Sequence, residues 1–167
     1  MLNKSEVDFS HGKSCYENGH KWYRQSEYER AIDCFIDAIS FFKKVIPADK
    51  NYMESREYLV VCYNNIGFYY KHMKGNNYCK QGNFVQAAEE WRVAISYYEK
   101  AISIDIDKDV NSIIRDLATC YFNIGIYYQN NKNYIEAIKH HEKAVSLDKN
   151  TPGAIENLRI CYNHLDI

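Results

Sequence analysis

Hydrophobic and polar positions follow a helical period along most of this chain. The clearest run is Tyr28, Ala31, Phe35 and Ala38, whose members are three or four residues apart. That spacing gathers the side chains on one face of an α-helix and leaves the opposite face polar. The same spacing returns twice later in the chain. The pattern therefore predicts an all-α protein built from recurring helices.

Three segments share a helix–turn–helix pattern in which a glycine of the first helix precedes an aromatic residue by three positions. Small residues let two helix axes approach closely, and aromatic side chains at 3- and 4-residue spacings fill the gaps between them. Short turns at residues 25–27, 81–83 and 131–133 join the helices into antiparallel pairs. The glycine and aromatic residues of the first helices are Gly19 and Trp22, Gly67 and Tyr70, and Gly125 and Tyr128, and the second helices carry Tyr28, Ala31, Phe35, Ala38; Phe84, Ala87, Trp91, Ala94; and Tyr134, Ala137, His141, Ala144.

This pattern resembles the tetratricopeptide repeat (TPR), whose template is an aromatic residue, Leu-Gly and Tyr, followed by Ala, Phe and Ala. The resemblance implies a right-handed superhelix of three helix–turn–helix repeats with a C-terminal capping helix. It divides the chain into repeat 1 at about 5–47, repeat 2 at about 51–105, repeat 3 at about 109–149, and a capping helix at about 152–165. The elongated repeats look most like those of the kinesin light chain subgroup.

The distances between the repeats exceed the 34 residues of the family template. Gly19 and Gly67 are 48 residues apart, and Gly67 and Gly125 are 58 apart. Part of the excess lies in the second helices, where Val45 and Ala101 continue the small-residue series by one heptad, or about 10 Å of helix. Residues 74–80 add a further segment, which either lengthens the first helix of repeat 2 or bulges out as a loop.

Several local sequences predict where helices begin and end. Ser5 with Asp8, and Asn51 with Glu54, have the spacing of capping boxes at helix starts. Pro47 is expected to end the second helix of repeat 1. Thr151 and Pro152 suit the cap and first position of a last helix, and this helix is expected to bury a stripe formed by Ile155, Leu158, Tyr162 and Leu165.

The resemblance also implies where a partner binds. In TPR proteins the first helix of each repeat lines the concave face, and its exposed positions meet the ligand. Counted from each glycine, the expected partner-binding groove consists of Lys13, Tyr16, His20, Tyr23, Asn64, Asn65, Phe68, His72, Thr119, Phe122, Asn123, Ile126, Asn130 and Asn157.

Three asparagines of this set, Asn65, Asn123 and Asn157, occupy matching positions two residues before a glycine or its equivalent. A ladder of side-chain amides could donate to and accept from an extended peptide backbone whatever its sequence. The alternative is that these asparagines cap or cross-link neighbouring first helices, with Phe68 and Phe122 in the core.

The best-known TPR subclass binds a C-terminal carboxylate with Lys and Asn side chains of the first helices, and this chain departs from it. Tyr16 and His20 stand at the expected positions of repeat 1, and Thr119 and Asn123 at those of repeat 3. Only Asn65 matches. The groove is therefore expected to be neutral and aromatic, which argues against the tails of heat-shock chaperones as ligands.

Composition narrows the function further. The 167 residues have a formal net charge of −1, so no overall field attracts nucleic acid or an anionic membrane. The sequence has neither a signal peptide nor a run of about 18 apolar residues, so we expect no membrane insertion. The six cysteines are far apart, and we interpret them as free thiols of a cytoplasmic protein.

No catalytic or metal-binding pattern stands out. His140 and His141 are adjacent, and neighbouring residues on a helix point about 100° apart, so they cannot easily share a metal ion. His141 falls at the Phe position of the repeat and is expected to be packed in the core. A loose calcium-loop pattern at residues 105–109 lacks the required Gly and Glu. The sequence contains no nucleotide-binding or hydrolase motif, and we expect no enzyme activity and no cofactor.

The prediction from sequence is therefore a non-enzymatic adaptor that binds a protein or peptide partner in the concave groove. Two alternatives stay open. One is an assembly or secretion-type chaperone for a single client protein. The other is a self-assembling scaffold, in which the terminal helix or the extended second helices form a homo-oligomer.

Overall fold

The computed structural model describes residues 3–104 and 109–165 of the chain. The elements in chain order are α1 (Lys4–Arg24), α2 (Tyr28–Phe42), α3 (Tyr52–Phe68), a π-helical segment η1 (Tyr69–Gly75), α4 (Asn76–Lys80), α5 (Phe84–Ile102), α6 (Asn111–Asn130), α7 (Tyr134–Leu147) and α8 (Ala154–Asn163). The described residues contain no β-strand. The all-α fold predicted from the sequence is confirmed.

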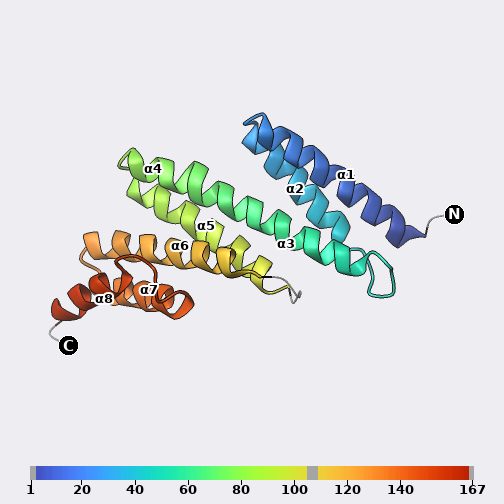
Figure 1. Ribbon diagram of the computed structural model, residues 1–167. Helices are drawn as coiled ribbons and strands as arrows, with labels where there is room; N and C mark the ends of the chain where they lie inside the picture. Colours follow the sequence, from blue (N-terminus) through green and yellow to red (C-terminus); the bar gives the residue numbers. More distant parts are fainter. Residues whose placement is uncertain (1–2, 105–108, 166–167) are drawn as a thin grey trace.

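The helices form three antiparallel pairs that stack in chain order. α1 pairs with α2, the continuous helix α3–η1–α4 pairs with α5, and α6 pairs with α7, while α8 packs on α7 (Figure 1). The two chain ends lie at opposite ends of the stack (Figure 1). Residue 105, where repeat 2 was expected to end, and Asp107 of the loose calcium pattern lie outside the described residues.

Glycines of the first helices lie directly under large rings of the second helices. A Cβ atom added to Gly19 would lie 2.7 Å from Phe35, one on Gly67 would lie 2.8 Å from Tyr98, and one on Gly125 would lie 2.5 Å from His141. All three glycines are buried. Because real Cβ atoms do not approach so closely, the missing side chain is what allows each pair of helices to close, as predicted.

Two further contacts of this kind change the alignment of the repeats. Gly12 lies under Phe42, and Gly75 lies under Trp91. Trp91 matches Phe35 and His141 in the second helices, so the counterpart of Gly19 and Gly125 in the middle pair is Gly75. Our sequence alignment, which used Gly67, was wrong by one heptad and one residue.

The three A–B turns (between the first, A, and second, B, helix of each pair) support the same alignment. Each contains one residue with positive φ, namely Ser26, Gly82 or Lys132. Each is closed by a backbone hydrogen bond to the carbonyl of Trp22, Tyr78 or Tyr128, at 3.0, 2.9 and 2.9 Å. Trp22 and Tyr128 follow their glycines by three residues, and Tyr78 follows Gly75 by three. Tyr78, and not Tyr70, is thus the aromatic counterpart in the middle pair.

The segment around η1 shows how the extra residues before the second A–B turn are accommodated. Residues 74–80 lengthen the first helix and do not bulge out as a loop. Gly67 and Gly75 are eight residues apart, whereas their partners Trp91 and Tyr98 are seven apart. A π-helical turn holds one more residue than an α-helical turn, so η1 absorbs the difference and both glycines keep their rings.

Several predicted helix ends were wrong. The first capping box is formed by Asn3 and Glu6, because α1 begins at Lys4. Ser5 instead accepts a hydrogen bond from the Ile46 amide at 3.3 Å. Asn51 is the N-cap residue of α3, as predicted, but its side chain caps nothing and the capping box with Glu54 does not form; its backbone N–H donates to Asp49 Oδ1 at 2.8 Å. The second helix of the first pair ends at Phe42, well before Pro47.

The last helix also begins later and buries a different face than predicted. Thr151 Oγ1 donates to the Asp148 carbonyl, and Gly153, with φ +78°, precedes the helix. Ala154 and Cys161, seven residues apart, are fully buried, and Cys161 packs with Ala137 and Ile138 of α7. Ile155, about 100° around the helix from Ala154, is 61% exposed because no described helix covers that side. Leu158, Tyr162 and Leu165 of the predicted stripe are half-buried.

Candidate functional site

The exposed surface of α1, α3–η1–α4 and α6, here called the A-helix face, is where the sequence placed the partner-binding groove. On α1, Tyr16 lies edge-on against Tyr58 of α3, with ring centroids 4.7 Å apart, and His20 lies against Tyr16 at 4.5 Å. Lys13 Nζ is 3.7 Å from Glu54 of α3. Tyr23 contacts Tyr28 at the start of α2, 5.2 Å away. The α1 residues therefore connect neighbouring helices as well as facing solvent.

A shallow hollow of about 360 Å³ lies along the C-terminal half of α1. It is lined by Tyr16, Glu17, His20, Lys21 and Arg24. The Nε2 atom of His20 is buried and has no hydrogen-bond partner among the described residues. Burial lowers the pKa of His20, and the neighbouring Arg24 lowers it further. The imidazole is therefore neutral near pH 7, and its buried Nε2 is left without a partner in the described chain.

The middle helix contributes four of the predicted residues. Phe68 contacts His72 with the rings tilted by 31° and their centroids 4.2 Å apart, and Asn76 Nδ2 lies 3.4 Å from His72 Nδ1. Asn64 is half-buried, and the amide nitrogen of Asn65 is buried without a partner in the described chain. Burial lowers the pKa of His72, with a further contribution from Lys71.

The predicted residues of α6 and α8 divide into packed and open positions. Phe122 contacts His141, with ring centroids 5.4 Å apart, and a Cβ on Gly153 would lie 3.3 Å from its ring. Thr119 donates to the Arg115 carbonyl, and Asn157 donates to the Gly153 carbonyl. The half-buried residues Asn123 and Ile126, together with the exposed Asn130, complete the predicted set on α6.

In the corrected alignment, the three asparagines of the predicted ladder do not occupy matching positions. Asn123 lies two residues before Gly125, and its counterpart in the middle helix is Met73, two residues before Gly75. Asn65 lies eight residues before Met73 and further from the turn, and its counterpart in α1 is Ser10, two residues before Gly12. Asn157 bonds within its own helix. The three amides therefore do not form one row.

Lys71 is the residue of this face that the sequence analysis missed. Its side chain is only 6% exposed, and its Nζ lies 2.6 Å from Oδ1 of Asp116 on α6, whose side chain is 31% exposed. The pair joins the second and third helix pairs. A signal was present in the sequence, because the eight-residue step from Gly67 to Gly75 requires a π turn that redirects the side chains between them.

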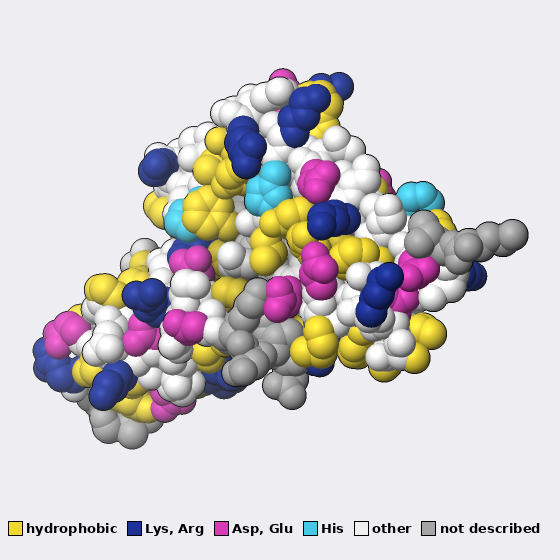
Figure 2. All heavy atoms as spheres, turned by 45° about the vertical axis from the view of Figure 1, so that its right-hand side comes forward, with side chains coloured by type: hydrophobic (Ala, Val, Ile, Leu, Met, Phe, Trp, Pro, Cys, Tyr) yellow, Lys and Arg dark blue, Asp and Glu magenta, His cyan; other side chains and the backbone are white. Residues whose placement is uncertain are grey.

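Charge on the surface is mixed. On the side of the molecule shown in Figure 2, Lys and Arg side chains alternate with Asp and Glu, and histidines lie beside hydrophobic side chains. Within the described residues, no three His, Cys, Asp or Glu side chains are grouped as a metal ion would require. None of the described helices is both long enough and apolar enough to cross a membrane.

His141 lies in the core, as its place in the repeat predicted. It is fully buried, and its Nε2 lies 3.3 Å from Gln129 Oε1. Burial lowers its pKa to about 4, with a smaller contribution from His140. His140 instead contacts the Glu136 carbonyl at 2.9 Å, so the two histidines point to different partners.

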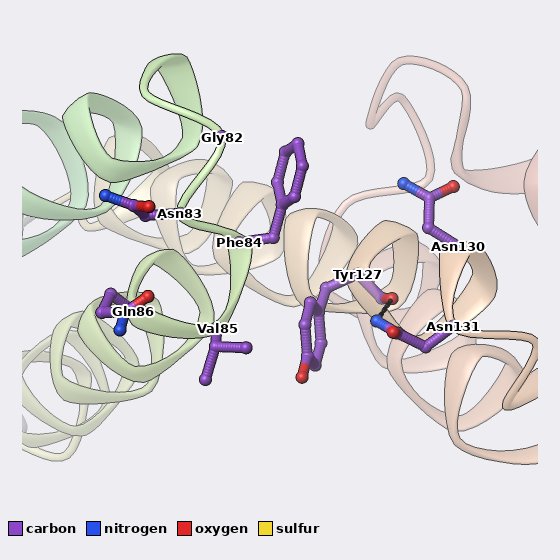
Figure 3. Close-up of a pocket in the computed structure, with 8 residues that line it drawn as sticks. All are labelled: Gly82, Asn83, Phe84, Val85, Gln86, Tyr127, Asn130 and Asn131. Carbon is purple, nitrogen blue, oxygen red and sulfur yellow. Dashed lines mark hydrogen bonds between the residues drawn. The ribbon is translucent and has the colours of Figure 1, made fainter.

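A second cleft lies between the A–B turn of the middle pair and the end of α6. Phe84 and Val85 at the start of α5 are 52% and 53% exposed, and they face Tyr127, Asn130 and Asn131 of the α6 terminus (Figure 3). The cleft has a volume of about 420 Å³ and is also lined by Gly82, Asn83 and Gln86. Asn130 is its only member among the residues that the sequence analysis selected.

One family model matches part of the chain, and the match falls on the third helix pair. Residues 118–151 match the family model described as Tetratricopeptide repeat. No curated protein matches the chain. The matched region comprises most of α6 and all of α7, and it has Gly125 under His141 at its centre. The fold as a whole is consistent with an all-α TPR superhelix.

Three solved structures are similar over nearly the whole chain. One is the C-terminal TPR-containing domain of a Plasmodium falciparum protein described as FK506-binding, with 19% identity over 98% of this chain and 94% of that one and a TM-score of 0.48. Another is the first TPR of Spaghetti (RPAP3) bound to the HSP90 peptide SRMEEVD, with 19% identity, coverage of 95% and 96%, and a TM-score of 0.38. The third is the first TPR domain of human RPAP3, with 19% identity, coverage of 93% and 93%, and a TM-score of 0.36. At these TM-scores the superpositions carry no argument about a site.

Proposed function

We propose that this chain, which carries a tetratricopeptide repeat at residues 118–151, is a non-enzymatic adaptor that binds an extended segment of a partner protein on its A-helix face. The proposal includes membership of the elongated, kinesin light chain-like subgroup, which the 19-residue α5 and its long partner helix support.

The observation that carries the proposal is a pair of buried polar atoms on this face. Nε2 of His20 and Nδ2 of Asn65 have no hydrogen-bond partner among the described residues. Leaving such an atom unpaired costs about 1–3 kcal/mol. Both residues are half-buried, so a modest rotation of either side chain toward solvent on binding would let a peptide backbone supply the missing partner. Tyr16 and Phe68, both half-buried, provide neighbouring apolar contact surface.

The charges support a ligand bound by amide and aromatic groups. The cations that reach across to neighbouring helices are already engaged, Lys13 with Glu54 and Lys71 with Asp116. Engaged cations are less available to an acidic tail than free ones, because a new carboxylate must compete with the internal one.

The test is peptide selection followed by measurement of affinity. Random peptides displayed on phage would be selected on the immobilised full chain, and enriched peptides measured by fluorescence anisotropy. We expect His20→Ala combined with Asn65→Ala to weaken binding about tenfold. Asn18→Ala, which removes an exposed amide from α1, is the matched control and should bind normally. Equal affinity of the double variant and the parent chain would show that this face is not the binding surface.

A self-assembling scaffold is the second candidate, and α8 is the observation that favours it. Ile155, Leu158 and Tyr162 line a largely apolar hollow of about 610 Å³ at the end of the stack. Light scattering over a range of concentrations would detect assembly as a rising mass. Ile155→Asp should abolish the rise, and a constant mass for the parent chain would eliminate this candidate.

We also propose a cytoplasmic location. All six cysteines are unpaired in the structure, as suits a reducing compartment. Localisation of a tagged full chain by microscopy would test this.

A further inference from the structure

The cleft at the second A–B turn has no charged lining. Its residues are glycine, asparagine, glutamine, valine, phenylalanine and tyrosine. Phe84 and Val85 expose about half of their surfaces there, although exposure of two adjacent large apolar side chains gains nothing for folding. Figure 3 shows Phe84 and Val85 on the α5 side of the cleft and Tyr127 on the α6 side, with the rings of Phe84 and Tyr127 pointing in opposite directions and with Asn83 and Gln86 on the side away from α6.

The hollow at the junction between the first and second pairs is charged and not apolar: it has a volume of about 350 Å³, and its lining includes Glu29, Asp33, Lys74 and Glu90. Tyr28 begins α2 as Phe84 begins α5, and its ring contacts both Tyr23 and Tyr69, at 5.2 and 6.5 Å. Glu29 takes the place of Val85, and it accepts a hydrogen bond from the Tyr69 hydroxyl at 2.8 Å and lies 3.5 Å from Lys74. Stacking of the repeats therefore does not require an open apolar cleft at this position.

Two hydrogen-bond donors of the cleft are unused within the described chain. The Tyr127 hydroxyl and the Asn130 side-chain amide make no hydrogen bond there, while Asn131 donates to the Tyr127 carbonyl at 2.7 Å and fixes the end of α6. The cleft therefore combines apolar side chains and an aromatic ring with free donors, and it has no formal charge.

We propose that this cleft binds a proline-rich segment in the polyproline II conformation. Such a segment offers carbonyl acceptors but few N–H donors, so its binding site must supply donors, here Tyr127 and Asn130. Its rigid rings pack on aromatic side chains, here the exposed Phe84 and the half-buried Tyr127, and an uncharged segment matches the uncharged lining. The volume of about 420 Å³ lies within the usual range for ligand sites.

The test uses an acetylated and amidated octaproline peptide, titrated into the ¹⁵N-labelled full chain and followed by NMR. We expect saturable shifts confined to residues 82–86 and 127–131. Phe84→Ala should weaken binding about tenfold, and Tyr127→Phe, which removes only the donor, by about threefold. Ile135→Ala is the matched control, because Ile135 is 60% exposed at the position in α7 that corresponds to Val85 in α5. Its affinity should equal that of the parent chain.

Three results would overturn the proposal. The first is the absence of saturation at about 1 mM peptide. The second is an unchanged affinity of Phe84→Ala with normal circular dichroism. The third is equal binding of a blocked peptide of the same length in which leucine replaces every second proline, since that would indicate a general apolar site. Shifts on α1 and α3 instead would place octaproline on the A-helix face, which contradicts this proposal and leaves the adaptor function standing.

Discussion

Two buried tyrosines should respond in opposite directions to the loss of one oxygen atom. The ring of Tyr98 covers Gly67 and is fully buried, and its hydroxyl has no hydrogen-bond partner in the described chain. Tyr69 is almost as buried, at 4% exposure, but its hydroxyl donates to Glu29 at 2.8 Å. The two residues therefore separate the cost of burying a hydroxyl from the benefit of its hydrogen bond.

The magnitudes follow from these contacts. An unpaired buried hydroxyl costs about 1–3 kcal/mol, so Tyr98→Phe should stabilise the protein by about 1 kcal/mol or more. Tyr69→Phe loses a hydrogen bond to a charged but exposed acceptor, so it should destabilise by about 1 kcal/mol. At a urea dependence of about 2 kcal/mol per M, each change moves the unfolding midpoint by about 0.5 M.

Urea unfolding followed by circular dichroism at 222 nm would measure both variants beside the parent chain. Tyr121→Phe is a useful third variant, because its hydroxyl donates to Glu99 at 2.8 Å from a half-buried ring, and it should behave like Tyr69→Phe with a smaller loss. A Tyr98→Phe variant less stable than the parent chain would refute the reasoning, because the hydroxyl must then have a partner in the folded protein.

Three further substitutions test the stacking and its electrostatics. Gly75→Ala should destabilise by about 1–2 kcal/mol in urea unfolding, since its Cβ would lie 2.5 Å from Trp91 and the cost of overpacking exceeds the helix propensity gained. Lys71→Met should destabilise the protein by about 1–3 kcal/mol, because it leaves Asp116 without its cation. Adding Asp116→Leu should restore most of the lost stability, and a double variant no more stable than Lys71→Met would show that the ion pair does not stabilise the fold. His141, with a folded pKa of about 4, binds a proton less readily than it does in the unfolded chain, so its contribution to stability is complete above about pH 6.5 and is lost as the pH falls toward 4. His141→Phe should remove that part of the pH dependence, and equal profiles of the two proteins would contradict the assignment.

The helix pairs were predictable because their pattern is local. Aromatic and alanine residues at helical spacing identify a buried face without knowledge of its partner, and the second helices accordingly begin directly after the predicted turns. The same holds for His141, whose burial follows from its place in the series.

The alignment of the middle pair could not be obtained in the same way. Gly67 and Gly75 both follow the small-residue rule, and only the second helix decides which ring covers which glycine. Asn-Ile-Gly at residues 65–67 resembles the same tripeptide at 123–125, and treating the two as counterparts moved the predicted groove of the middle helix by eight residues. Which ring covers which glycine depends on residues far apart in the sequence, and the local similarity of the two tripeptides led to the wrong pairing.

Helix ends were the least predictable feature. Ser5 has the residue type and spacing of a cap, but Asn3 stands two residues earlier with Glu6 at the right distance and forms the box instead. At the other end, Thr151 bonds back to Asp148, and the left-handed Gly153 delays the start of α8. In both places several residues were suited to the same role, and the surrounding contacts selected one of them.

The seven residues of η1 have a consequence for how such arrays lengthen over time. An extra residue in an α-helix would turn everything beyond it by about 100° and pull Gly75 away from Trp91. Because a single wide turn takes up the whole rotation, this architecture can accept insertions one amino acid at a time and need not grow by complete heptads. A sequence template of fixed period would lose its register by one residue at such a point.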